Sequence, residues 1–162
     1  LFSPAEINSE LYREWFTEAL EKEGLELIAV PVTTSAEVTE AVSVLLRRDI
    51  QVVGQLSDNT TRPAFIQMVR RTRDAKMAFF CFDSTGMRDG ATLALARDFY
   101  ASGVEAAWVA VKVLRGASPE NIPFTNTRTE TLAINTDLIA KYGIVISKEL
   151  LKKAQLSTGE KP

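Results

Sequence analysis

Along the first two-thirds of the chain, short apolar runs alternate with longer segments whose apolar residues recur at helical spacing. The runs predict strands near residues 25–32, 51–56, 77–82 and 91–95. The segments between them predict helices, and one of these carries a buried stripe of Val38, Ala41, Val42 and Leu45. Alternating strands and helices are typical of a parallel sheet that is covered by helices on both faces. We therefore predict one three-layer α/β/α lobe built on a parallel sheet with right-handed crossovers.

Capping residues mark the starts of the predicted helices. Ser3 and Glu6 have the spacing of a capping box ahead of a first helix, although Asn8 or Ser9 could cap that helix instead. A second capping-box spacing opens a helix over residues 34–48. These signals fix where the helices begin, and hence where the loops between strands and helices lie.

Two tryptophans are expected to be buried. Trp15 falls on the apolar stripe of the first helix, and Trp108 falls on that of a helix over residues 98–115. The inward residues of this later helix would be Val104, Ala107, Trp108, Val111 and Leu114. Core packing is therefore favoured over ligand stacking for both tryptophans.

The pattern changes after Gly116, where a proline-containing loop precedes a strand and two short helices. We divide the chain into a ligand-binding lobe at 1–124, a crossing strand with short helices at 125–156, and a polar tail at 157–162. Leu1 and Phe2 are interpreted as the end of a strand. The apolar residues of the crossing part are expected to lack their natural partner, so this segment should fold back on the lobe, pair with a second copy or be mobile. These residues are Leu132, Ile134, Leu138, Ile139, Ile144 and Leu150.

Composition excludes several kinds of chemistry. The chain has 162 residues, a net charge of −2 and no histidine, which argues against nucleic-acid binding and removes histidine-based triads. The single Cys81 lies in an apolar run and is expected to be a small buried residue. No glycine-rich phosphate loop is present, and no apolar run is long enough to cross a membrane. We therefore expect no cofactor, no metal site and no catalytic residues.

Candidate binding residues follow the predicted strands and open the first helix. Asp58 and Asp83 each come just after a strand, so both should lie at one edge of the sheet, where ligands bind in open α/β sheets. Asn8 and Ser9 lie at a helix N-terminus, which suits a carboxylate or phosphate. Capping is the alternative for all four residues, because short polar side chains also satisfy free backbone groups at helix ends.

A longer pattern resembles a known family. The residues that carry the resemblance are Ser3-Pro4-Ala5-Glu6-Ile7-Asn8-Ser9, Ser57-Asp58-Asn59-Thr60, Phe82-Asp83-Ser84, Arg88-Asp89-Gly90-Ala91 and Asp98-Phe99-Tyr100. In this order they resemble the C-terminal half of bacterial ABC-transporter substrate-binding proteins, which have the type I periplasmic-binding fold. The resemblance implies two α/β lobes with a ligand between them. It also implies that the ligand contacts are Asn8, Ser9, Asp58, Asn59 and Asp83.

The resemblance implies a solute-binding component of an ABC importer that binds a small polar solute such as an amino acid, and not an enzyme. Its partners would be that ligand, a transporter permease and the missing N-terminal lobe, and the fragment could also form a homodimer. Its location would be periplasmic, or extracytoplasmic and membrane-anchored. Two alternatives stay open, which are a sensory ligand-binding domain of the same fold and a flavodoxin-like enzyme domain.

Overall fold

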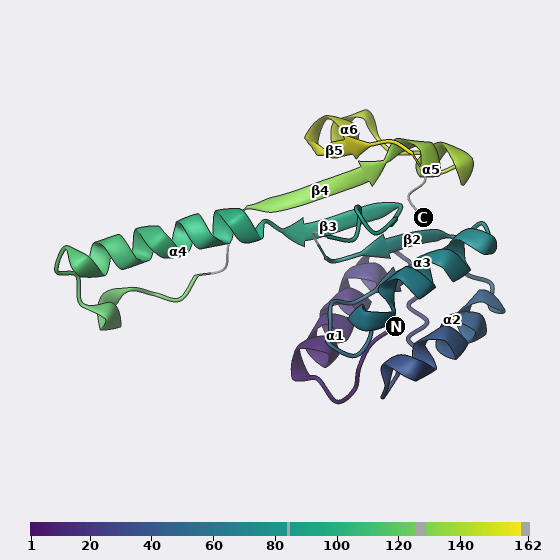
Figure 1. The fold of residues 1–162 in the computed structure, drawn as a ribbon, viewed down its shortest axis with the longest axis horizontal. Helices are drawn as coiled ribbons and strands as arrows, with labels where there is room; N and C mark the ends of the chain where they lie inside the picture. The colour runs from purple at the N-terminus through teal and green to yellow at the C-terminus, as the bar shows by residue number, and fades with distance from the viewer. Residues whose placement is uncertain (84, 126–128, 160–162) are drawn as a thin grey trace.

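The computed structural model describes residues 1–83, 85–125 and 129–159, which form an α/β body with one helix projecting from it (Figure 1). The α-helices are α1 (Ile7–Lys22), α2 (Val38–Leu46), α3 (Phe65–Asp74), α4 (Phe99–Leu114), α5 (Thr136–Lys141) and α6 (Lys148–Lys153). Short 3₁₀ helices are η1 (Ser35–Glu37), η2 (Arg62–Ala64) and η3 (Pro119–Asn121). The strands are β1 (Val52–Gln55), β2 (Ala78–Cys81), β3 (Leu93–Arg97), β4 (Glu130–Asn135) and β5 (Gln155–Ser157).

In the described part of the chain, the strands form one sheet in the order β1-β2-β3-β4-β5. The pairs β1–β2 and β2–β3 are parallel, with Val53 opposite Phe79 and Cys81 opposite Ala94. These strands confirm the predicted parallel α/β sheet. β4 is antiparallel to β3, and β5 is parallel to β4, so the sheet is mostly and not wholly parallel.

Leu1 and Phe2 lie beside β1 and extend the sheet on that side. The Leu1 amine donates to the carbonyl of Gly54, and Phe2 makes a parallel bridge with Pro31. The predicted strand at 25–32 is wrong apart from this bridge. The reason is that a strand needs a partner, and residues 25–29 have no described segment beside them with which to form a ladder.

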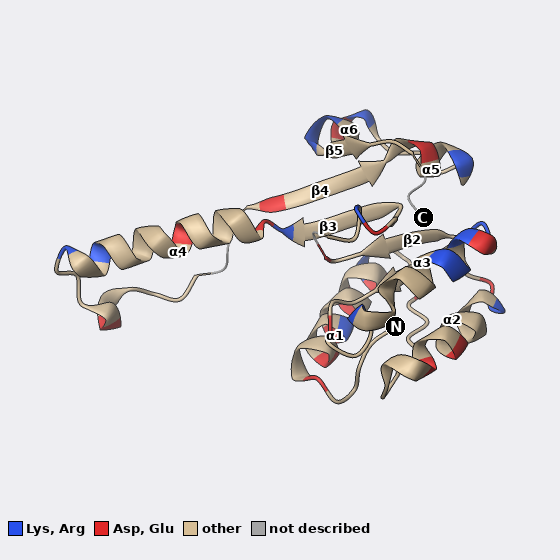
Figure 2. Cartoon of the chain, in the orientation of Figure 1, with Lys and Arg blue, Asp and Glu red and all other residues tan. Residues whose placement is uncertain are grey.

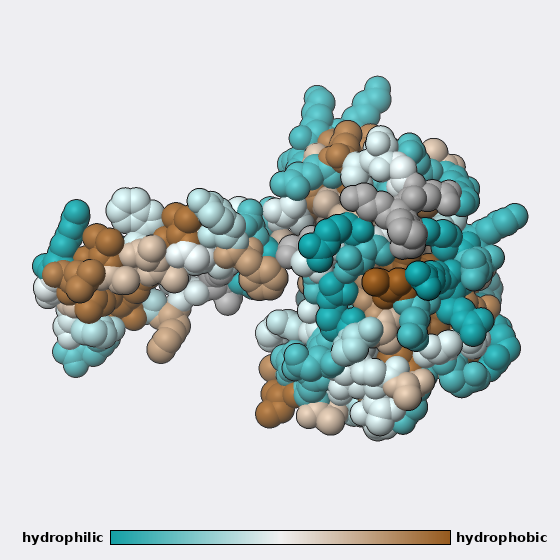
Figure 3. Space-filling view, viewed as in Figure 1, coloured by the Kyte–Doolittle hydropathy of each residue, from teal (hydrophilic) through white to brown (hydrophobic). Residues whose placement is uncertain are grey.

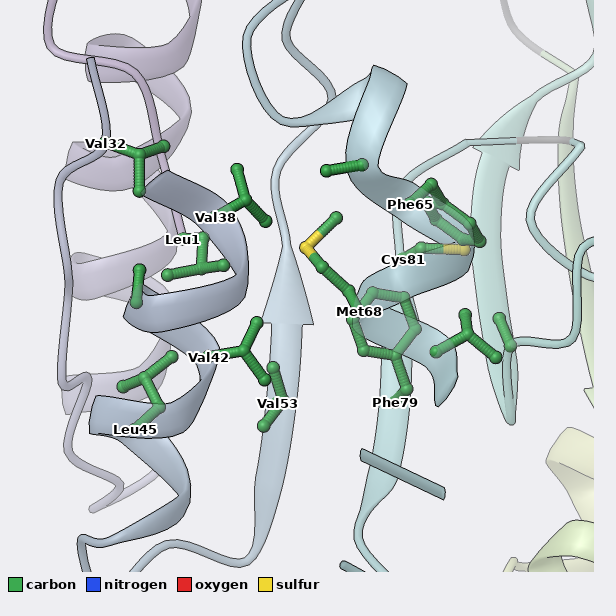
Figure 4. Close-up of a cluster of buried hydrophobic side chains, with 14 of the residues drawn as sticks. Leu1, Val32, Val38, Val42, Leu45, Val53, Phe65, Met68, Phe79 and Cys81 are labelled. Atoms are coloured by element: carbon green, nitrogen blue, oxygen red, sulfur yellow. The ribbon is translucent and has the colours of Figure 1, made fainter. Parts of the chain in front are cut away.

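One face of the sheet is covered by α2 and α3, which enclose the main core (Figure 4). The predicted stripe of α2 is buried as expected. Phe65 of α3 and Phe79 of β2 meet edge to face with their ring centroids 5.3 Å apart. Burial of a side chain of this size stabilises the fold by about 1.5–3 kcal/mol. Cys81 also lies in this core, so its predicted burial is confirmed.

The opposite face of the sheet is covered by α1. Phe82 points away from Phe79 because side chains alternate along an extended chain, and its ring lies 5.4 Å from that of Phe16 in α1. The predicted burial of Trp15 is wrong, since 58% of this residue is exposed. Apolar spacing identifies the helix correctly, but α1 is rotated so that Ser9 is its one buried residue.

Helix α4 projects from the body as an arm, which we define as residues 99–125 (Figure 1). Asp98 caps it by accepting a hydrogen bond from the Ala101 amide. No residue of α4 is buried, so the predicted inward stripe is wrong, and Trp108 is 63% exposed. Exposed apolar side chains lie along the arm (Figure 3). A helical pattern predicts an apolar face but does not specify what that face contacts.

The segment that follows the arm returns to the sheet. Ile134 of β4 and Leu138 and Ile139 of α5 are buried, so the segment folds back on the lobe, which is one of the outcomes expected for it. The proposed lobe boundary at residue 124 stays a prediction, and residues 160–162 of the predicted tail lie outside the described part. Lysines are concentrated on α6, whereas glutamates are frequent on α1 (Figure 2).

Candidate functional site

The loop that follows β1 meets the start of α1 at the carboxyl edge of the sheet. Ser9 and Asp58 are in direct contact, with the Ser9 hydroxyl donating to Asp58 Oδ2 over 2.9 Å. Asn8 is exposed, and its side-chain amide lies 3.5 Å from the carbonyl of Ser57. The structure therefore brings the helix start and the loop after β1 together, as the sequence predicted.

Asp58 is buried and fully engaged by the protein. Its Oδ2 accepts from the Ser3 amide and the Ser9 hydroxyl, and its Oδ1 accepts from the amide and hydroxyl of Thr61 at 2.6 and 2.7 Å. A carboxylate offers about four acceptor positions, so these donors fill them. In this structure Asp58 positions three segments of backbone, and it has no acceptor position left for a ligand.

Glu6 holds the other half of the same loop. Its Oε2 accepts from the backbone and side-chain amides of Asn59, and its Oε1 accepts from the amide and hydroxyl of Thr60. Hydrogen bonds, first of all that from the Asn59 backbone, lower the pKa of Glu6 below its ordinary value. Sequence reasoning assigned Glu6 to a helix cap and missed this role, which depends on a contact 53 residues away along the chain.

Asp83 belongs to a second cluster, organised by Arg62. The Arg62 guanidinium lies 3.1 Å from Asp83 Oδ2 and 2.8 Å from Asp89 Oδ2, and it also stacks on the ring of Phe65. Asp83 Oδ1 accepts from the amide and hydroxyl of Thr85. The sequence gave no signal for Arg62, since its two carboxylate partners come from a loop more than 20 residues away.

An apolar cavity of about 430 Å³ lies next to the loop after β1, on the α1 side of the sheet. Aromatic residues of α1, of the β2 end and of the start of the arm form much of its wall. They are Tyr12, Trp15, Phe16, Phe82 and Phe99. Ser57 also lines it, so the cavity and the polar loop are neighbours.

Comparison with known proteins identifies the family. Residues 1–157 match the family of ABC transporter substrate binding proteins. The chain belongs to this family. The chain is also 24% identical over 139 residues to the tyrosine-binding protein of Clostridioides difficile strain R20291, and this alignment covers 86% of this chain and 40% of that relative.

Solved structures confirm a periplasmic-binding-protein-like α/β lobe. The conserved domain protein of Vibrio cholerae O1 biovar eltor superposes with a TM-score of 0.81 at 26% identity, covering 98% of this chain and 53% of that one. The ABC domain of Streptococcus pneumoniae in complex with L-Trp gives the same TM-score and identity, covering 96% and 52%. The chain therefore spans about half the length of these solved structures.

Membership of a family of substrate-binding proteins fits the prediction that the chain is not an enzyme. Among the described residues, no cluster of acidic residues and cysteine could hold a metal ion. No helix in residues 1–83, 85–125 and 129–159 is both long and apolar enough to cross a bilayer. The assignment of individual ligand contacts stays a prediction.

Proposed function

We propose that this chain is one lobe of an importer receptor that binds a free amino acid in a cleft between this lobe and a second one. The observation that carries the proposal is the structural match to a domain in complex with L-Trp. The match covers 96% of this chain and about half of that domain. The relative described as a tyrosine-binding protein supports the same class of ligand. Cleft ligands gain affinity when a second lobe closes over them and excludes water.

The carboxylate of the amino acid would bind at the start of α1. Within the described chain, the amides of Ile7 and Asn8 make no backbone hydrogen bond, and no side chain caps this helix. Free amides and the helix dipole at an N-terminus both favour an anion. The exposed side chain of Asn8 adds a further donor beside these amides. Ser9 is buried against Asp58, so it supports this site from behind.

The ammonium group of the ligand would bind to Asp83 and Asn59. Asp83 is partly exposed, and its Oδ2 has one arginine partner and room for a second donor. Asn59 is exposed and donates its backbone N–H and its side-chain amide to Glu6, and its side-chain carbonyl oxygen has no partner among the described residues. Asp58, with its four protein donors, is assigned to holding the loop and not to contacting the ligand.

The arm would pack on the second lobe. Its exposed apolar residues include Phe99, Tyr100, Trp108 and Leu114, and an apolar face of this length is not stable in water without a partner (Figure 3). The missing lobe, the permease and an extracytoplasmic location belong to this proposal, because each follows from the family and from the half-length match.

The test is calorimetry with L-Trp, L-Tyr and L-Leu, using this chain and a longer chain that includes the preceding lobe. We expect micromolar or tighter binding of at least one amino acid by the longer chain only. In that longer chain, Asp83→Asn should weaken binding by roughly 1.5–3 kcal/mol, the scale of a charged hydrogen bond. The matched control is Asp74→Asn, the same chemical change at the opposite edge of the sheet, where α3 ends. Equal affinity in both variants would remove Asp83 from the site.

A further inference from the structure

Arg62 connects the two loops that carry the candidate ligand contacts. Its backbone belongs to the loop after β1, where the Arg62 amide donates to the carbonyl of Asp58 over 3.2 Å. Its guanidinium reaches the loop after β2, where Nε lies 3.1 Å from Asp83 Oδ2 and Nη2 donates to Asp89 Oδ2 over 2.8 Å. Nη2 also donates to the hydroxyl of Thr85. One side chain therefore fixes the loop after β2 relative to the loop after β1.

The surroundings of the guanidinium hold it in one orientation. It stacks on the ring of Phe65 with its central carbon 4.6 Å from the ring centroid, and Phe65 is itself buried in the core. Pro63 directly follows Arg62, and both lie in the short helix η2, so the backbone that carries this side chain has little freedom. A planar guanidinium can bond two carboxylates through different nitrogens, and a lysine ammonium cannot reproduce this geometry.

Asp83 is held through both of its carboxylate oxygens. Its Oδ1 accepts from the amide and the hydroxyl of Thr85 at 2.7 and 2.6 Å, and its Oδ2 faces Nε of Arg62. A carboxylate offers about four acceptor positions, so one position on Oδ2 has no donor among the described residues. Arg62 and Thr85 together therefore set the direction from which a further donor can approach Asp83.

The charges around Arg62 favour one additional cation. Asp83 and Asp89 share the single guanidinium, and their side chains are only 15% and 16% exposed. Arg88 lies 3.5 Å from the other oxygen of Asp89, but its side chain is 72% exposed, so water screens much of this interaction. The partly buried group of two carboxylates and one guanidinium therefore has one negative charge in excess, which suits a ligand with a single ammonium group.

We propose that Arg62 is a positioning residue of the amino-acid site. It directs the open acceptor position of Asp83 toward the ligand ammonium, and it fixes this carboxylate relative to Asn59 on the neighbouring loop. Arg62 acts through Asp83 and not by direct contact, because a guanidinium placed against an ammonium would repel it. This inference rests on the function proposed above, since it requires that Asp83 binds the ligand.

The test uses the longer chain that includes the preceding lobe, and the variant Arg62→Lys. This change keeps the positive charge but removes the separate nitrogens that bond Asp83 and Asp89 at the same time. In calorimetry with the tightest-binding of L-Trp, L-Tyr and L-Leu, we expect Arg62→Lys to weaken binding by about tenfold, within the loss expected for Asp83→Asn. The matched control is Arg71→Lys, the same change at an exposed position in the last turn of α3, and it should bind like the unaltered chain.

A double-mutant cycle separates positioning from a general effect on the loops. If Arg62 acts through Asp83, Arg62→Lys should weaken binding by less than about twofold once Asp83→Asn is present. Asp89→Asn removes the second carboxylate that anchors Arg62, so it serves as a further variant that should weaken binding in the same direction and also lose its effect in the Asp83→Asn background.

Two results would overturn the inference and leave the proposed function intact. One is equal affinity of Arg62→Lys and Arg71→Lys, and the other is a loss for Arg62→Lys that simply adds to that of Asp83→Asn, since additive losses indicate independent effects. Failure of the unaltered longer chain to bind any of the three amino acids would instead overturn the proposed function, and this inference with it.

Discussion

In a polypeptide that begins at Leu1, the buried amine of this residue makes stability depend on pH in a window where few other groups titrate. The chain has no histidine, so no imidazole competes between pH 6 and 8. The hydrogen bonds to Glu6 and Glu37 lower the pKa of both carboxylates, which places their titration on the acid side of this window. Burial raises the pKa of the Cys81 thiol to about 11, so its contribution begins only above about pH 9.

The direction in which stability changes with pH follows from comparing the folded and the unfolded chain. Desolvation lowers the pKa of the folded amine from 8.0 to about 6. The unfolded chain therefore binds more protons between pH 6 and 8, and stability rises with pH through this range. The free-energy cost of burying the charged amine is absent above pH 8 and fully present below about pH 6. Two pKa units correspond to roughly 2.7 kcal/mol, which is a large share of the stability of a small domain.

The assay is urea denaturation at pH 6.0 and 8.5 of the chain released from a fusion so that it begins at Leu1. The matched control is the same chain with its amine acetylated, which has no proton to lose. We expect the free-amine chain to gain on the order of 2–3 kcal/mol between the two pH values and the acetylated chain to change by much less. Equal pH dependence in both chains, or none in either, would refute the burial of a charged amine at this position.

Three further changes test other parts of the structure. Asp58→Ala should destabilise the lobe by roughly 2–4 kcal/mol because it leaves buried donors unsatisfied, whereas Asn59→Ala should cost much less in the same urea titration. Gly86→Ala should destabilise by roughly 1–3 kcal/mol because its Cβ would collide with the Cys81 sulfur. Adding Cys81→Ala should relieve part of that loss, and strict additivity of the two changes would contradict the collision. Trp108→Ser should alter thermal stability by less than about 0.5 kcal/mol, since nothing in the described chain buries this side chain, and should reduce association in analytical ultracentrifugation.

Much of the fold could be predicted from the sequence because its signals are local. The stripe of α2, the apolar run of β2 and the cap at Asp98 each depend on neighbours within a few residues. Glycines at the ends of helices could be predicted for the same reason. Gly24 and Gly116 follow α1 and α4 with φ angles of 70° and 98°, and residues that have a Cβ rarely adopt such angles.

The failures all involve the partner of an element and not its type. Trp15 and Trp108 lie on real helices, but whether a helix face is buried depends on what packs against it. The segment at 25–32 has the composition of a strand and lacks a ladder, because no described segment lies beside residues 25–29 to pair with them. Likewise, β4 is paired with β3 in an antiparallel register that no local pattern encodes.

The candidate site was predicted in position more than in detail. Strand ends and a helix start placed Asn8, Ser9 and Asp58 at one edge of the sheet, and the structure brings them together. Composition could not show that Asp58 would be saturated by protein donors. It also could not show that Glu6 and Arg62 would hold the loops, because both act on partners distant in sequence.

The attachment of the arm links the proposed second lobe to the candidate site. The arm leaves the sheet after Arg97 and returns just before Glu130, two residues that lie opposite each other in the β3–β4 ladder, and the Asp98 amide donates to the Thr129 carbonyl at 3.1 Å. Both connections therefore cross at one point, as in a hinge, where few dihedral angles need to change for one body to move against the other. Phe99 at the base of the arm lines the cavity beside the loop after β1. A partner bound to the arm would therefore rotate about a point adjacent to the loop that holds Asn59, so closing the lobes and covering the candidate site would be a single motion.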